Sequence, residues 1–111
     1  MEEGMVGIFL FLIAMTVTGY CDQTGAPPYQ GITASGMKAT EITMACPPEM
    51  PFGTVILMDG RIFLCMDRGP AIKDNHLDRW FPTCIDAILW GVQEKRVFIL
   101  NESFVRKSLL K

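Results

Sequence analysis

The sequence predicts a single, mainly β domain with one or two short helices. Glycine and proline residues cut the chain beyond residue 15 into short runs, and such spacing favours strands over helices. Several of these runs are rich in Val, Ile, Phe and Thr, which are common in strands. A chain of 111 residues fits one domain, and 50% hydrophobic against 20% charged side chains is too apolar for a disordered tail.

The strongest local signal is Asp59-Gly60, which lies between two of these runs. A two-residue Asp-Gly loop suits a type I′ turn, because glycine tolerates its positive φ angles and aspartate accepts them. We therefore expect a β-hairpin over residues 54–66. The segments expected to be strands are residues 16–21, 42–46, 54–58, 61–66 and 96–100.

One helix is expected after Pro82, over residues 83–94. Thr83 and Asp86 are placed as its N-cap and the third-residue partner of that cap. The apolar residues of this segment should close one end of a small barrel, which makes them packing residues and not a binding surface. They fall at the helical spacing i, i+3, i+4 and i+7: Ile85, Ile88, Leu89 and Val92.

Residues 5–15 form an uninterrupted apolar run behind two acidic residues. The run resembles the h-region of a secretion signal, or a short anchor through which the chain would associate with a membrane. However, signal peptides begin with Lys or Arg, and eleven residues are too few to span a bilayer unaided. A buried first strand or helix is the other interpretation, and both stay open. The expected boundaries are 1–15 for this segment, 16–101 for the β domain and 102–111 for a C-terminal tail.

Charge and cysteine spacing argue against several partners. A formal net charge of −2 and a pI near 5.3 give no electrostatic footprint for nucleic acid. The four cysteines lie 25, 19 and 19 residues apart, without a CxxC pair, and the single His76 cannot complete a familiar zinc set, so no metal or other cofactor is expected. An even cysteine count allows two disulfides in an exported protein, with three pairings open, and equally allows reduced thiols.

Two aspartates, eleven residues apart, are candidates for acid–base chemistry. Asp67 directly follows the hydrophobic run 62–66, so it should emerge at a strand end, where a rigid scaffold presents side chains to a cleft. Asp78 lies beside Leu77 and close to a Trp-Phe pair. Apolar surroundings disfavour the charged form of a carboxyl group, which raises its pKa and suits a general acid acting on a glycosidic oxygen. Two loop-capping aspartates would give the same pattern.

Five separated segments resemble, in order and spacing, the motifs of the three-aspartate (3D) domain. This family is a branch of the double-psi β-barrel superfamily that includes membrane-bound lytic transglycosylase A. MPFGT resembles the family's IPLGT, DRGPAIK resembles DTGGAIK, and NHLD resembles NRID. The resemblance extends roughly from residue 16 to residue 100. The matching segments are residues 17–21, 31–36, 50–54, 67–73 and 75–78.

The resemblance implies a small six-stranded double-psi β-barrel that acts as a peptidoglycan lytic transglycosylase. Such an enzyme cleaves the β-1,4 bond between N-acetylmuramic acid and N-acetylglucosamine without water and leaves a 1,6-anhydromuramyl product. Asp78 matches the family's catalytic acid/base, and Asp67 matches the aspartate that supports it in the same groove. The expected protein is a monomer, secreted or in the cell envelope, whose partner is the glycan strand.

The resemblance also implies a set of substrate-binding residues. Tyr20 and Tyr29 could stack on sugar faces, whereas core packing is the expected role of Trp80. The full set of implied substrate-binding residues is Tyr20, Cys46, Thr54, Arg68, Lys73 and Asn75.

Several residues depart from the family's motifs. Cys46 stands in the column of the first aspartate, and the loss of a nearby negative charge should lower the pKa of a remaining acid. If that aspartate was lost late, Cys46→Asp is expected to be tolerated and to raise activity. Arg68 replaces a threonine and could pair with Asp67 or with a ligand carboxylate, and Asp74 replaces a glycine. These changes leave two other interpretations open, a non-catalytic glycan-binding barrel and a reactive Cys46 thiol.

Overall fold

The computed structural model describes residues 11–22 and 31–100, which form a closed barrel of six strands with one short helix. The expected fold class, a small and mainly β barrel of six strands, is confirmed. No helix among the described residues is long and apolar enough to cross a membrane. The elements in chain order are β1 (Phe11–Tyr20), β2 (Thr43–Ala45), β3 (Val55–Met58), β4 (Arg61–Asp67), β5 (His76–Trp80), α1 (Cys84–Trp90) and β6 (Gln93–Leu100).

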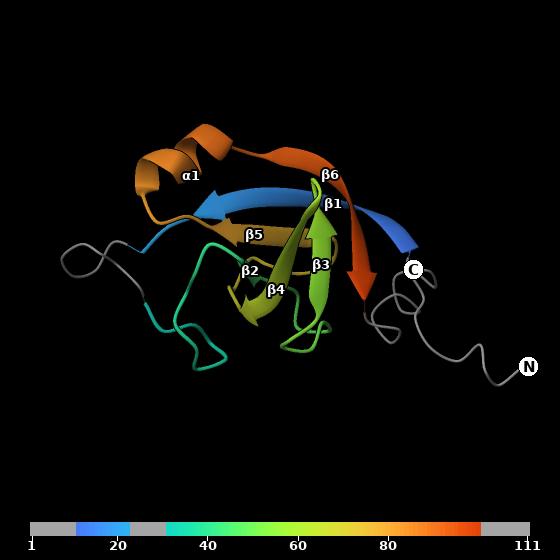
Figure 1. The fold of residues 1–111 in the computed structure, drawn as a ribbon, viewed down its shortest axis with the longest axis horizontal. Helices are drawn as coiled ribbons and strands as arrows, with labels where there is room; N and C mark the ends of the chain where they lie inside the picture. Colours follow the sequence, from blue (N-terminus) through green and yellow to red (C-terminus); the bar gives the residue numbers. More distant parts are fainter. Residues whose placement is uncertain (1–10, 23–30, 101–111) are drawn as a thin grey trace, which may run out of the picture.

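Except for the hairpin of β3 and β4, neighbouring strands of the barrel are not consecutive in the chain (Figure 1). Around the barrel the order is β1-β5-β2-β4-β3-β6, and β6 closes onto β1. β1 runs parallel to β5 and β2 runs parallel to β4, whereas the other four pairings are antiparallel. Parallel partners require long connections, so β1, β2, β4 and β5 converge only when the whole barrel forms.

Alternate side chains of the strands fill the barrel. In β1, Met15 and Val17 are almost fully buried, and in β6 the same holds for Val97 and Ile99. The residues between them point to the other face, as the period of two in a strand requires. The outward face of β1 is apolar at Leu12 and Ala14 and polar from Thr16 onward, and Thr18 on this face belongs to the candidate site below.

The hairpin expected over residues 54–66 is confirmed. β3 and β4 pair antiparallel, with Met58 opposite Arg61. Asp59 and Gly60 form the turn with φ angles of 53° and 74°, and two positive angles in succession are typical of type I′. The turn also contacts β6, because Lys95 Nζ lies 3.0 Å from the Asp59 carboxylate.

β1 begins at Phe11, five residues before the expected start of the first strand. The second half of the apolar run thus pairs with β6, from Phe11 opposite Ile99 to Met15 opposite Lys95. Ile13 and Met15 are buried in the barrel core and are not available to a bilayer. A buried first strand is therefore the correct interpretation for residues 11–15. Residues 1–10 and the tail 102–111 lie outside the described residues.

The helix has its expected cap but not its expected length. Thr83 is the N-cap, and its hydroxyl oxygen accepts a hydrogen bond from the backbone N–H of Asp86. α1 ends at Trp90, and Gly91 follows it with a positive φ of 68°. Glycine adopts this conformation without the strain that a side chain would add, which stops the helix there. The expected extension to residue 94 is therefore wrong.

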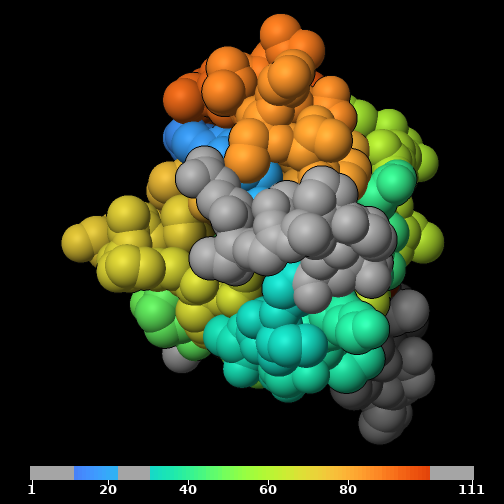
Figure 2. Space-filling model, turned by 90° about the vertical axis from the view of Figure 1, so that its left-hand side faces the viewer, coloured from blue at the N-terminus to red at the C-terminus, as the bar shows by residue number. Residues whose placement is uncertain are grey.

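The apolar side of α1 lies on the surface, so the expectation that it closes the barrel is wrong. The helix packs through Ala87, which is buried against β1. A Cβ at Gly19 would lie 2.9 Å from the Phe81 ring and 3.0 Å from the Ala87 carbonyl oxygen, so glycine permits this close approach. In Figure 2 the helix, in orange, protrudes at the top of the face. The side chains left exposed, by 69% to 77%, are Ile85, Ile88, Leu89 and Val92.

The sequence alone did not predict two features of the fold, the strand β5 and the pairing of the cysteines. β5 has a polar sequence, and it becomes a strand by pairing with β1 on one side and β2 on the other. Two disulfides, Cys21–Cys84 and Cys46–Cys65, select one of the three pairings that the spacing left open. Cys21–Cys84 joins the end of β1 to the first residue of α1 and fixes the helix on the barrel.

Candidate active site

Asp67 and Asp78 flank the same residue of the barrel. Ala45 in β2 is the register partner of Asp78 in β5 and of Asp67 in β4. Adjacent strands lie about 4.8 Å apart, so the Cα atoms of the two aspartates are separated by about 10 Å. The fold thus brings together the two carboxyl groups that the sequence singled out.

A β-bulge orients Asp67 towards this site. Met44 pairs with Cys65, but the next residue, Ala45, pairs with Asp67, so Met66 is skipped in the register. Without this extra residue Asp67 would follow the alternation of Phe63 and Cys65, whose side chains are buried in the core. Bulges redirect a side chain in this way and are frequent beside functional sites.

Asp67 is held by three hydrogen-bond donors. The Tyr20 hydroxyl donates to Oδ2 at 2.6 Å, and the backbone N–H groups of Ala34 and Arg68 donate to Oδ1 at 2.9 Å each. Burial raises the pKa of Tyr20, and the hydrogen bond to Asp67 raises it further. The phenol therefore keeps its proton and remains a donor. This arrangement fixes a carboxylate in one position, as a supporting residue of a site requires.

Asp78 lies in a different environment. It is half-buried, and its Oδ1 accepts a 2.8 Å hydrogen bond from the Thr18 hydroxyl, whose oxygen lies 2.9 Å from His76 Nε2. Burial raises the pKa of Asp78, and the charge of Asp67 adds to this effect, whereas Thr18 and His76 oppose it. Burial prevails, so the pKa of Asp78 lies above the ordinary value of an aspartate. A raised pKa favours the protonated form that a general acid needs.

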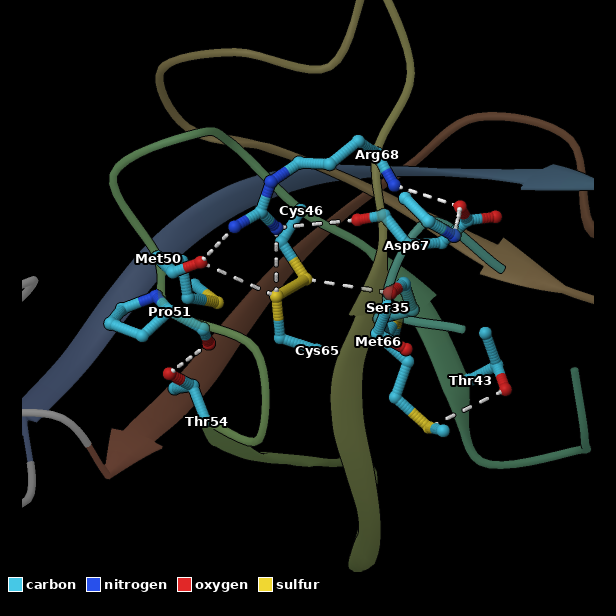
Figure 3. The surroundings of a disulfide bond; sticks show 12 residues. Ser35, Thr43, Cys46, Met50, Pro51, Thr54, Cys65, Met66, Asp67 and Arg68 are labelled. Atoms are coloured by element: carbon cyan, nitrogen blue, oxygen red, sulfur yellow. Dashed lines mark hydrogen bonds between the residues drawn. A yellow bond between two sulfur atoms is a disulfide. The ribbon is translucent and has the colours of Figure 1, made fainter. Parts of the chain in front are cut away.

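Cys46 is neither a ligand-contacting residue nor a thiol. Its side chain is fully buried, and its sulfur is bonded to Cys65, which excludes the reactive-thiol interpretation (Figure 3). The disulfide lies directly beside the site, since Cys46 follows Ala45 in the chain and Cys65 precedes Asp67 by two residues. A covalent bond between β4 and the end of β2 thus stands at the position that the resemblance matches to the first aspartate of the motif.

Arg68 braces a loop instead of pairing with the Asp67 carboxylate. Its guanidinium donates to the Met50 carbonyl oxygen at 2.7 Å and to Cys65 Sγ at 3.2 Å. It also stacks over the Phe52 ring, 4.1 Å from the centroid. Figure 3 shows Arg68 reaching across the disulfide towards Met50, which fixes residues 47–53 against β4. Of the two partners that the sequence allowed for Arg68, Asp67 or a ligand carboxylate, the Asp67 side chain forms no ion pair with this guanidinium.

The other implied substrate-binding residues differ in position. Thr54 is 4% exposed and donates its hydroxyl hydrogen to the Pro51 carbonyl oxygen, so it is not available to a ligand. Asn75 is exposed, but its side chain donates to the Ala14 carbonyl oxygen at 3.3 Å and holds β5 on β1. Lys73 is exposed in the loop between β4 and β5. Of the six residues, Tyr20 alone binds either aspartate side chain through its own side chain.

The aromatic residues follow the expectation in part. Trp80 is 3% exposed, which confirms core packing as its role, and its Nε1–H donates to Asp22 at 3.0 Å. Tyr29 lies outside the described residues. Asp22, which the sequence did not indicate as a site residue, accepts a further hydrogen bond from the backbone N–H of Gly31.

Thr18 was also not predicted, although the alternation of side chains along a strand places it on the same face of β1 as Tyr20.

In the described ranges 11–22 and 31–100, no three His, Cys, Asp or Glu side chains are grouped so that they could hold a metal ion.

A sequence model described as "3D domain" matches residues 42–101. The match covers more than half of the chain and includes both Asp67 and Asp78. The chain belongs to the 3D domain family.

Known proteins similar to this 3D domain are longer. The cell wall-binding protein YocH of Bacillus subtilis (strain 168) is 30% identical over 95 residues, which cover 80% of this chain and 32% of YocH. Two structures of E. coli lytic transglycosylase MltA, one of them in an apo form, have TM-scores of 0.56 and 0.55 at 23% and 24% identity. Each alignment covers 71% of this chain and 29% of MltA. These structures share the fold, and the chain spans about a third of the length of the proteins it matches.

Proposed function

We propose that this 3D domain is a peptidoglycan lytic transglycosylase. It would cleave the β-1,4 bond between N-acetylmuramic acid and N-acetylglucosamine and form a 1,6-anhydromuramyl end. The observation that carries the proposal is the half-buried Asp78, whose pKa is raised by burial, beside an Asp67 fixed by three donors. The similarity to a cell wall-binding protein and to a lytic transglycosylase supports the same substrate.

In the first step, Asp78 donates its proton to the glycosidic oxygen. The bond between this oxygen and the anomeric carbon breaks, and its electron pair stays on the oxygen. Thr18 binds Oδ1 of Asp78, which leaves Oδ2 to carry the transferred proton. The fixed negative charge of Asp67 would stabilise the positive charge that develops on the sugar ring.

In the second step, Asp78 acts as the base. Its carboxylate takes the proton of the C6 hydroxyl while the C6 oxygen bonds to the anomeric carbon, so Asp78 is protonated again at the end. The substrate supplies the nucleophile and no water is consumed. A single acid/base residue therefore suffices, in contrast to the two carboxyl groups of ordinary glycosidases.

The proposed place of action is the cell envelope or the outside of the cell. Disulfides persist in oxidising compartments and are rare in the cytosol, and this chain has two. The extracytoplasmic location that this supports is also where the proposed substrate lies.

The experiment incubates the purified protein with purified peptidoglycan and analyses the soluble products by mass spectrometry. The expected products are anhydromuropeptides, each one water lighter than the corresponding hydrolysis product. Asp78→Asn should reduce their rate of formation by about 10²–10⁴-fold. The matched control is Asp59→Asn, which changes an exposed aspartate in the hairpin turn and should leave the rate unchanged. Hydrolysis products alone, or a wild-type rate in Asp78→Asn, would reject the mechanism.

A second candidate function is a non-catalytic glycan-binding barrel. The Cys46–Cys65 disulfide in place of the family's first aspartate favours it, since one carboxylate is missing from the site. Sedimentation of the protein with peptidoglycan, without any anhydro product across the pH range, would select this function.

A further inference from the structure

A cavity of about 470 Å³ lies at the end of β5, beside α1, which is within the size range of small-molecule sites. It is separate from the carboxyl pair, because neither Asp67 nor Asp78 is among its lining residues. Three aromatic residues form a large part of its wall: Trp80, Phe81 and Trp90.

Arg79 is held in this wall by aromatic rings. The carbon of its guanidinium lies 4.9 Å from the Phe63 ring centroid, 4.7 Å from that of Phe81 and 4.8 Å from that of Trp90. These are cation–π distances. Its Nε is buried and finds no hydrogen-bond acceptor among the described residues. Aromatic contacts therefore fix the guanidinium in the cavity wall, where its terminal N–H groups could donate to a ligand.

The charges around the cavity favour an uncharged ligand. Glu41 and Asp86 line it together with Arg79. The net charge of these three side chains is −1, which repels an anion, while the guanidinium offsets much of the attraction that the carboxylates would exert on a cation. A ligand with many hydroxyl and amide groups is attracted to both, since Arg79 donates hydrogen bonds while the carboxylates and the carbonyl oxygen of Gln93 accept them. The aromatic faces offer apolar contact to the C–H face of a sugar ring.

We propose that this cavity binds a sugar ring and is an accessory glycan site on the barrel, distinct from the pair Asp67 and Asp78. The class of ligand, an uncharged sugar, follows from the lining. The choice of an N-acetylhexosamine rests on the proposed function, because that is the sugar class of the peptidoglycan strand. A second contact of this kind would hold the strand while Asp78 acts on one of its bonds.

Tryptophan fluorescence tests the proposal directly. The chain contains two tryptophans, Trp80 and Trp90, and both line the cavity. The Asp78→Asn protein is titrated with tetra-N-acetylchitotetraose, a linear β-1,4-linked oligomer of N-acetylglucosamine, so that binding is measured without turnover. We expect a saturable change in tryptophan emission.

Two variants remove cavity groups in the same Asp78→Asn background. Arg79→Met keeps a long side chain but removes the guanidinium, and Glu41→Ala removes an exposed carboxylate. Each should weaken binding about tenfold, the effect of losing one or two hydrogen bonds to the ligand. Circular dichroism checks folding, and Glu41→Ala keeps the test valid if Arg79→Met does not fold. The control is Ile85→Ala, which changes an exposed residue of α1 outside the lining and should bind normally.

Each outcome decides the proposal. No emission change, or unchanged affinity in Glu41→Ala and Arg79→Met, would overturn it. Binding of N-acetyl-D-alanine in place of the oligosaccharide would assign the cavity to a carboxylate and also overturn it. If Asp78→Asn binds the oligosaccharide saturably but the wild-type protein forms no anhydro product, the glycan site in the cavity is supported and only the transglycosylase activity is rejected. Turnover without such binding would reject only the cavity.

Discussion

The Thr18 hydroxyl donates a 2.8 Å hydrogen bond to Oδ1 of Asp78, its register partner on the parallel strand β5. The oxygen of the same hydroxyl lies 2.9 Å from His76 Nε2. A hydroxyl has a single hydrogen, so when Asp78 is ionised and accepts it, Nε2 of His76 must carry the proton of the second bond. The three residues form one chain of hydrogen bonds that favours the charged form of Asp78 against the burial that disfavours it.

Thr18→Val should shift the pH dependence of activity. The valine keeps the shape of the side chain but removes a hydrogen bond that lowers the pKa of Asp78, so this pKa should rise. Because Asp78 acts first as an acid, the basic limb of the kcat/KM profile should move to higher pH. Thr18→Ser keeps the hydroxyl and is the matched control. A basic limb that stays in place in Thr18→Val would count against the assignment of Asp78 as the acid.

Asp78 should also make the free energy of unfolding depend on pH. Burial raises its pKa in the folded protein, so the folded state binds more protons than the unfolded state between the ordinary aspartate pKa and the raised value. Stability attributable to Asp78 is therefore present at low pH and is lost as the pH rises through this window. Asp78→Asn removes this loss. The stability of the variant relative to wild type, measured as the difference in the free energy of unfolding, should therefore be greater at neutral pH than in acid. Urea denaturation at both pH values measures the difference, and an equal difference would contradict the raised pKa.

Tyr20→Phe should destabilise the fold by about 1–2 kcal/mol, since it removes one of three hydrogen bonds to a carboxylate. The effect should also lower turnover, because Asp67 is then less well fixed. Urea denaturation measures the loss. A double-mutant cycle provides the control: in the Asp67→Asn background, Tyr20→Phe should cost less. An equal cost in both backgrounds would show that the hydroxyl acts through another group.

Removal of the Cys46–Cys65 disulfide should lower the free energy of unfolding by about 3 kcal/mol, because the two cysteines are 19 residues apart and a disulfide that closes a loop of this length stabilises by about that amount. The double variant Cys46→Ala/Cys65→Ala tests this by thermal or urea unfolding. Cys46→Asp should lose at least as much, because it also breaks the bond and introduces a carboxyl group at a fully buried position. We therefore expect Cys46→Asp to destabilise the protein, whereas the sequence alone indicated that this substitution would be tolerated and would raise activity. Wild-type stability of either variant would show that the disulfide contributes little.

The sequence predicted the features that depend on neighbours in the chain. The Asp59-Gly60 turn and the Thr83 cap form from local φ angles and local hydrogen bonds, so their residue types suffice to identify them. The apolar spacing of α1 predicted a helix correctly but placed its apolar side in the core. That error arose because α1 docks on the barrel through Ala87 beside Gly19, through Trp90 and through the Cys21–Cys84 disulfide, which are contacts between residues distant in the chain.

The sequence by itself determined that the chain is a small β barrel and, through its motifs, that Asp67 and Asp78 belong together. Only the tertiary structure decided which groups surround the two carboxyl groups and hydrogen-bond to them. Four contacts decide this, and each joins segments that are far apart in the chain: the pairing of Ala45 with both aspartates, the bulge that turns Asp67, the hydrogen bond from Thr18 to Asp78, and the disulfide Cys46–Cys65. Strand register sets these contacts, and register is fixed only when the barrel closes around its buried side chains.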